Sequence, residues 1–459
     1  MRLLISAAPA SALPRGFTIH FDTRVFLFAF AVACVTGILA GLAPAFHASS
    51  LNFQDNLKEG SRTFTRSRQY WQRLIITGEV GMAMVMLIGA GLAVKSLVRL
   101  LGVQLGFDPQ HVLAAGVQLP AARYPKEYQQ AAFYQNLIER VRALPGVVSA
   151  AAASDLPLGG GNDGPLYIEG QPVPKDVWTG PAVRSCEVTP GHFKTLGIPL
   201  LGGRDFTLAD TSESPKVAII SEAMARQFWP GTDAIRRRFK FSYQSKEWIT
   251  VVGVVGDVRE YGLERPGMPE AYYPETQETS SALTLVVRAA DDPLAQIAAI
   301  RSALHSLDKD LPLYGPRPLS ELVSQSSAKK RFLALLLSLF AVTALSVAAI
   351  GIYGVVAHNV AQRTHEIGIR IAVGAKRSHV LKLVVGEAFR VTLTGVALGT
   401  LSALGLTRYL KSLIYAVRPT DPLTFASVAA MLLLVALLAS YIPARRAMDV
   451  DPMVALRYE

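Results

Sequence analysis

The chain has 459 residues, of which 51% are hydrophobic and only 18% charged, and its formal net charge is +11. Soluble domains carry about 25% charged residues, so this balance favours a membrane protein and excludes a mainly disordered chain. Two cysteines, Cys34 and Cys186, are too few for a disulfide scaffold, a four-cysteine zinc site or an iron–sulfur cluster. The length allows roughly two or three domains.

Five apolar stretches are each near the ~20 residues that a bilayer core requires. They cover residues 25–46, 74–94, 332–356, 391–407 and 423–442. A long polar region, about residues 98–330, separates the second stretch from the third. The predicted fold class is therefore a multi-pass α-helical membrane protein with a large α+β extracytoplasmic domain between spans.

Lysine and arginine residues gather in three segments: the loop 47–73, the loop between the third and fourth spans, and the C-terminal tail. If all five spans cross, these segments share one side, which the positive-inside rule makes the cytoplasm. We therefore predict a cell (inner) membrane protein with residues 1–24 and 98–330 outside and the C-terminus cytoplasmic. Because the loops account for most of the positive charge, no nucleic-acid partner is expected.

The two ends of the chain are similar to each other at a constant offset of 399 residues. Pro44 then aligns with Pro443, and Asp22 aligns with Asp421 before each span. We expect the first span, 25–46, to be the last span of a truncated first unit, and 74–97 to begin the second unit. The open alternative is that another polypeptide supplies the missing part.

The outer region alternates strand and helix patterns. Strands are predicted at 112–119, 147–153, 183–188, 216–220, 248–258 and 283–288, and helices at 126–144, 222–228 and 293–307. Gly/Pro-rich stretches such as 156–174 interrupt the pattern and indicate two subdomains.

The outer region contains no pattern typical of catalysis or metal binding. The glycine-rich stretch 158–164 lacks the Gly-Lys-Ser/Thr end of a phosphate-binding loop, and His192 has no second histidine at metal-ligand spacing. Asp257 ends an apolar strand without a second carboxylate tied to it by sequence. We predict no catalytic residue, no metal site and no cofactor.

The loop after the third span has the pattern of a short amphipathic helix. Ile367 and Ile371 form an apolar edge one turn apart, while Arg363, Glu366 and Arg370 form a charged face. Gly374 is placed to end the helix, as glycine commonly does. On physical grounds alone, a generic interfacial helix is the alternative.

This loop resembles the cytoplasmic coupling segment of ABC transporter permeases of the MacB/FtsX type. The tail Pro443-Ala-Arg-Arg-Ala447 is similar to the end of the same permeases, and the internal repeat resembles duplicated orphan permeases. The resemblance implies a MacB-like core domain at 98–330 and an FtsX-like permease domain with three spans at 331–459. It also implies a set of ATPase-coupling residues. These are Arg363, Glu366, Ile367, Gly368, Arg370 and Gly374.

The function that the resemblance implies is a permease subunit for export or mechanotransmission. The sequence has no Gly-x-x-x-x-Gly-Lys-Ser/Thr loop, so a separate ABC ATPase is the expected partner, with a homologous permease unit or a homodimer and membrane lipid as further partners. A membrane-anchored sensor or scaffold without transport is the first alternative. An ion-coupled transporter is a weaker one, because it would require several charges within the spans.

Three residues inside the spans are further candidates. Glu79 is ionisable within the second span, where such residues are functional candidates, although it can also reach the interface or pair with Arg73. Gly395 and Gly399 form a small-residue step that allows close helix approach. We expect this step to serve packing within the unit more than a dimer interface.

Overall fold

The computed structural model describes residues 62–171, 182–241, 247–362, 377–407 and 414–448, together with residues 23–24, 27–28, 30–31 and 34–35. Its contacts divide the chain into two compact units. The first comprises residues 1–98 and 330–459, and the second comprises residues 99–329.

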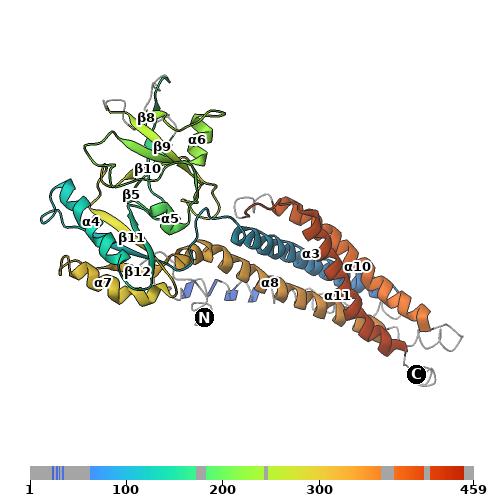
Figure 1. The fold of residues 1–459 in the computed structure, drawn as a ribbon. Coiled ribbons are helices and arrows are strands. Elements are labelled where there is room, and N and C mark those ends of the chain that lie inside the picture. The colour runs from blue at the N-terminus through green and yellow to red at the C-terminus, as the bar shows by residue number, and fades with distance from the viewer. Residues whose placement is uncertain are drawn as a thin grey trace. The chain divides into compact units, whose positions relative to one another are not determined.

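Within the first unit, four helices of the described chain are long and apolar enough to cross a membrane (Figure 1). They are α3 (Arg62–Leu101), α8 (Leu319–Gln362), α10 (Arg377–Leu406) and α11 (Pro422–Met448). Each helix contains one predicted span but is longer, because hydropathy detects only the apolar part of a helix that continues into polar surroundings. Pro443, expected where the last span ends, lies inside α11. The predicted first span, 25–46, lies largely outside the described residues.

The helices pack through small and aliphatic side chains. The central helix is α3, whose Val80, Met84, Ile88 and Leu92 are completely buried. Ala341, Ala348, Ala403 and Ala436 complete this core from the other three helices. Large apolar side chains on the outside of the bundle, such as Ile350 and Leu438, are exposed. An apolar exterior is expected of helices that lie in lipid.

In its described residues, the second unit is built on one mixed sheet of twelve strands. One half of the sheet has the order β12-β1-β11-β2 and is antiparallel. Its elements are β1 (Val112–Gln118), α4 (Glu127–Arg142), β2 (Val147–Ala153), β11 (Ala282–Ala289), the 3₁₀ turn η4 (Pro293–Gln296), α7 (Ile297–His305) and β12 (Tyr314–Pro318). Alternate residues of β1 and β11, including Leu113 and Leu285, form a core with α4 and α7.

The other half of the sheet continues from β2 in the order β5-β10-β7-β9-β8-β4, with β3 against β5 and β6 against β9. Its strands are β3 (Asn162–Pro165), β4 (Tyr167–Ile168), β5 (Ala182–Val188), β6 (Leu200–Gly203), β7 (Val217–Ser221), β8 (Arg238–Lys240), β9 (Ile249–Val255) and β10 (Glu270–Pro274). Two short helices, α5 (His192–Leu196) and α6 (Glu222–Phe228), accompany it. Ser221 caps α6 by accepting a hydrogen bond from the Met224 backbone.

The predicted fold class is confirmed by four membrane-length helices and an α+β unit between the first and second of them. All six predicted strands and three predicted helices of the outer region are present within a few residues. Strands that sequence patterns missed are short, such as β4 and β8, or buried on both faces, such as β10. The region expected to form two subdomains shares one continuous sheet.

Candidate functional site

Two glycines of α10 bring that helix into close contact with α3. A side chain at Gly399 would come within 2.7 Å of the Gly81 carbonyl oxygen, and one at Gly395 within 2.8 Å of Val80 Cβ. Glycine is favoured at both positions, because a Cβ would meet backbone atoms or the Cβ of a packed side chain rather than the end of a flexible one. The predicted small-residue step thus packs α10 against α3 within the same unit.

Glu79 lies on a different face of α3, against α8. Its carboxylate contacts the backbone at Gly351, where any side chain would collide with it. The alternative pairing with Arg73 is not what the structure has, because Arg73 instead forms an ion pair with Glu387 of α10. An intramembrane carboxylate is thereby placed at the contact between α3 and α8.

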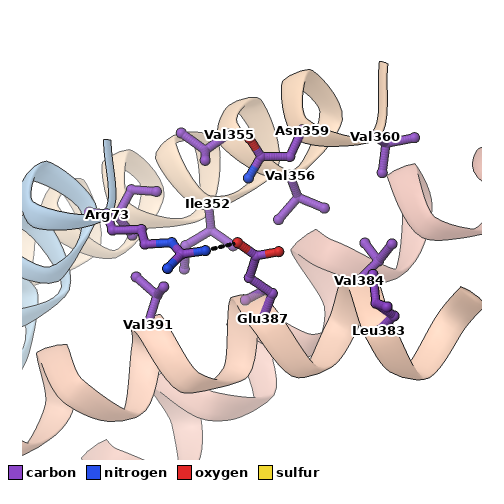
Figure 2. A pocket seen from close by; sticks show the side chains of 12 residues that line it. Arg73, Ile352, Val355, Val356, Asn359, Val360, Leu383, Val384, Glu387 and Val391 are labelled. Carbon is purple, nitrogen blue, oxygen red and sulfur yellow. Dashed lines mark hydrogen bonds and ion pairs between the residues drawn. The ribbon is translucent and has the colours of Figure 1, made fainter. Parts of the chain in front are cut away.

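A narrow pocket lies where three apolar stripes meet at one end of the bundle (Figure 2). Residues spaced three or four apart supply each stripe, as expected for one face of a helix. The stripes come from α3 (Arg73, Ile76), α8 (Ile352, Val355, Val356, Asn359, Val360) and α10 (Leu383, Val384, Glu387, Ala388, Val391). Figure 2 shows the Arg73 guanidinium reaching across to the Glu387 carboxylate in the middle of this lining.

Polar groups in this pocket are few. Half of the Arg73 side chain is exposed, at 49%, whereas the Glu387 side chain is 24% exposed. The buried Oδ1 of Asn359 has no hydrogen-bond partner among the described residues. The cavity measures about 40 Å³, which is enough for a water molecule but not for an organic substrate.

The pocket lies at the helix ends that flank the predicted coupling segment. Helix α8 ends at Gln362 and α10 begins at Arg377, and both contribute to the lining. The predicted coupling residues themselves lie outside the described part of the chain. These are Arg363, Glu366, Ile367, Gly368, Arg370 and Gly374. The sequence analysis did not identify Glu387 as a site residue. The sequence does contain a signal for it, because the Glu387 carboxylate shares one helix face with the apolar residues Val384, Ala388 and Val391.

The opposite end of α3 is held to a different part of the bundle. Lys95 Nζ lies 2.6 Å from Asp421 Oδ2, and the Tyr415 backbone N–H donates to Ser96 Oγ over 2.8 Å. Asp421 also caps α11, because its carboxylate accepts hydrogen bonds from the backbone and hydroxyl of Thr424. Asp421 thus has a structural role at the start of the last helix.

The α+β unit contains a buried ionic network that the sequence did not reveal. Arg184, 2% exposed, forms ion pairs with Glu260 at 3.0 Å and with Glu270. Burial raises the pKa of both carboxyl groups, and the positive charge of Arg184 offsets only part of that rise. Arg184 Nη2 also donates to the Gly160 carbonyl oxygen over 2.7 Å. This bond anchors the glycine-rich stretch 158–164 and gives it a structural role.

The remaining polar residues singled out from the sequence of this unit are also structural. His192 is buried, and burial lowers its pKa to about 3, so the ring is neutral. Asp257 accepts hydrogen bonds from the Ala223 backbone and from Arg226, which secures the start of α6. Within the described residues, no group of three His, Cys, Asp or Glu side chains is placed to hold a metal ion.

Two family models match the chain. The model for the MacB-like periplasmic core domain matches residues 80–307, and the model for the FtsX-like permease C-terminal region matches residues 338–452. Together they cover most of the α+β unit and most of the last three membrane helices.

Curated relatives are similar to this chain in sequence. The macrolide export ATP-binding/permease protein MacB of Wolinella succinogenes is 28% identical over 288 residues, covering 60% of this chain and 44% of that protein. The pyoverdine export ATP-binding/permease protein PvdT of Pseudomonas savastanoi pv. phaseolicola is 27% identical over 278 residues, covering 58% of this chain and 42% of that protein. The chain thus spans less than half the length of these relatives. The crystal structure of the periplasmic region of MacB from Actinobacillus actinomycetemcomitans aligns at 14% identity with a TM-score of 0.33, covering 49% of this chain and 95% of that one.

Proposed function

This chain belongs to the MacB/FtsX-type family of ABC transporter permeases, and we propose that it couples a separate cytoplasmic ATPase to its extracytoplasmic domain. The work performed by such a complex is export, as the names of the relatives describe for those proteins, or mechanical transmission. The coupling segment in this proposal is 363–375, with Arg363, Glu366 and Arg370 as its charged face.

One observation carries the coupling role: α8 is a single helix from Leu319 to Gln362. Its residues up to 329 belong to the α+β unit, and those from 330 onward belong to the helical unit. A continuous helix is stiff because backbone hydrogen bonds link each turn to the next. A displacement imposed next to Gln362, where the coupling segment begins, therefore propagates along α8 toward Leu319.

The pocket around Arg73 supports the same role. The end of α8 and the start of α10 both contact it, so a movement of the coupling segment acts on both helices. Through the Arg73–Glu387 ion pair, α10 is also tied to α3, the other helix that enters the α+β unit. Three of the four helices thus meet where the proposal places the ATPase.

A charge reversal in the coupling segment tests the proposal. Glu366→Lys places a cation between Arg363 and Arg370 and should weaken copurification of the ATPase at least tenfold, because charged groups determine register at such contacts. Membrane insertion should be unchanged. Glu213→Lys, at an exposed position of the α+β domain, is the matched control. Association with the ATPase that is equal in the two variants would exclude this docking segment.

The proposed topology places loops 47–73 and 357–390 and the C-terminus in the cytoplasm, and the α+β domain outside an inner membrane. Single cysteines at Ser378 and Ser212, both exposed, test it in a background without Cys34 and Cys186. Labelling from outside should reach position 212 and not 378, and the reverse pattern would overturn the assignment. The exposed apolar side chains of α8 and α11 suit contact with lipid or with a second permease unit.

A further inference from the structure

The outer face of α11 carries an apolar row that ends in two arginines. Leu434, Leu438 and Ile442 follow one another at four-residue spacing and are exposed, and Arg446 continues the row beside the exposed Arg445. Leu434 is the middle residue of the candidate span Pro422–Arg446. At 1.5 Å per residue, Arg446 lies about 18 Å from it along the helix. One leaflet of the hydrocarbon core is about 15 Å thick, so the row spans a leaflet and its cations reach the headgroups.

Helix α8 meets this row at its charged end. Arg446 Nη1 donates a hydrogen bond to the Tyr353 hydroxyl over 3.3 Å. One turn earlier on α8, Ile350 is 70% exposed. Tyrosine is enriched at membrane–water interfaces, where its ring lies among acyl chains and its hydroxyl reaches the headgroups. The contact between Tyr353 and Arg446 therefore holds a cation where the exposed apolar faces of two helices meet the headgroup region.

Neither helix supplies a carboxylate that would neutralise these arginines. Helix α11 contains no Asp or Glu, and the only acidic residue of α8 is Glu321, at its opposite end. Within the described part of the chain, Arg445 and Arg446 form no ion pair, and the tail carboxylates of Asp449 and Asp451 lie outside that part. The hydrogen bond to a neutral hydroxyl leaves Arg446 its full charge and most of its N–H donors, which suits an anion.

We propose that this face of α8 and α11 binds an anionic phospholipid, with its phosphate on Arg446 and Arg445 and an acyl chain along the apolar row of α11. A zwitterionic phospholipid would bring its own cation against the two arginines. A second copy of this chain, packed symmetrically through the same face, would bring the arginines of the two copies together. The anionic lipid alone pairs the charge and covers the apolar row. This inference goes beyond the coupling function and does not depend on it.

Native mass spectrometry of the full-length chain, titrated in detergent with dioleoylphosphatidylglycerol or dioleoylphosphatidylcholine, tests this assignment because the two lipids differ only in headgroup. The anionic lipid should bind at least fivefold more tightly. Arg446→Gln should weaken its binding about fivefold, the effect of one basic residue at an anionic lipid surface, and should leave the zwitterionic lipid unchanged. Lys382→Gln also removes one exposed positive charge, but on α10, and is the matched control that should have no effect.

Further variants and probes keep the test decisive. Arg445→Gln should cause a similar loss if Arg446→Gln fails to fold, and Tyr353→Phe, which removes only the hydroxyl that positions Arg446, should weaken the anionic lipid about twofold. Glycerol 3-phosphate, which has no acyl chain, should not bind measurably. The proposal is overturned if the wild type binds the two lipids equally, or if the Arg446 and Lys382 variants lose the same affinity. Glycerol 3-phosphate that binds as tightly as the lipid, or a wild-type dimer that excludes both lipids, would also overturn it.

Discussion

Replacing Arg184 with methionine should strongly destabilise the α+β domain. The guanidinium is 2% exposed, and it lies between Glu260 and Glu270, which are 4% and 2% exposed. Methionine fills a similar volume without charge, so packing is largely retained. The variant leaves two buried carboxyl groups without their cation, and breaking a buried pair in this way costs about 3–5 kcal/mol. For a domain of this size, about 4 kcal/mol corresponds to a fall in Tm of roughly 8–16 °C.

The loss of stability in Arg184→Met should increase as the pH increases. Burial raises the pKa of both carboxyl groups above the ordinary value of 4.5, and Arg184 opposes that rise. Without Arg184 the pKa of each rises further, so the folded variant binds protons that the unfolded chain releases. Its stability is then retained below pH 4.5 and lost as pH increases above that value. The difference in Tm between wild type and Arg184→Met should be smaller at pH 5 than at pH 8.

Thermal unfolding of the full-length chain in detergent, followed by near-ultraviolet circular dichroism, measures these effects. Arg301→Met is the matched control, because Arg301 is exposed on α7. A triple variant that adds Glu260→Gln and Glu270→Gln to Arg184→Met also removes the two carboxylate charges. This variant should recover at least half of the fall in Tm that Arg184→Met causes. An Arg184 variant that melts like the Arg301 control, or a triple variant that is no better than the single one, would refute the reasoning.

Three further predictions concern other parts of the molecule. Gly399→Ala should cost about 1–3 kcal/mol in detergent unfolding because its Cβ meets backbone at 2.7 Å, whereas Gly405→Ala, with nothing within 4 Å, should be neutral. Burial raises the pKa of Glu275 to about 7, so its contribution to stability should fall by roughly 3 kcal/mol between pH 4.5 and 7, and Glu275→Gln should abolish that dependence. A double-mutant cycle on Arg73→Gln and Glu387→Gln should give a coupling of about 1 kcal/mol, and additive effects would argue against the ion pair.

Local patterns in the sequence were enough to predict most of the fold. The membrane helices were identifiable because a run of about twenty consecutive apolar residues is rare outside membrane spans. Helix α4 was identifiable because Phe133, Leu137 and Val141 share one face. Strand β10 was missed because all five of its residues are buried, so that it shows no alternation. Strand β8 was missed because three residues are too few to show a period.

The polar contacts were much less predictable, because they join residues that only the fold brings together. Arg184 and Glu270 lie on neighbouring strands but are 86 positions apart in sequence. Arg73 and Glu387 are 314 positions apart, whereas the sequence offered the nearer carboxylate of Glu79 as one possible partner of Arg73. Glu79 contacts Gly351 instead, since its position on α3 directs it toward α8 rather than α10. Spacing along a helix thus predicted which face each residue occupies but not which helix that face meets.

Helix α3 is held to α10 and to the start of α11 along its length, and these contacts determine how it can move in the proposed coupling. Arg73, near one end, is bound to α10, and Lys95, near the other, is bound to the residue that caps α11. Between them, Gly395 and Gly399 hold α10 so close to α3 that sliding of one along the other would meet backbone collisions. Small residues at a helix contact let the two backbones approach this closely. The movement that reaches the α+β domain through α3 should therefore be mainly a tilt or rotation of α3 together with α10. Cross-linking α3 to α10 beside Gly399 should leave coupling intact, because the two helices move together, whereas cross-linking α3 to α8 beside Gly351 should abolish coupling.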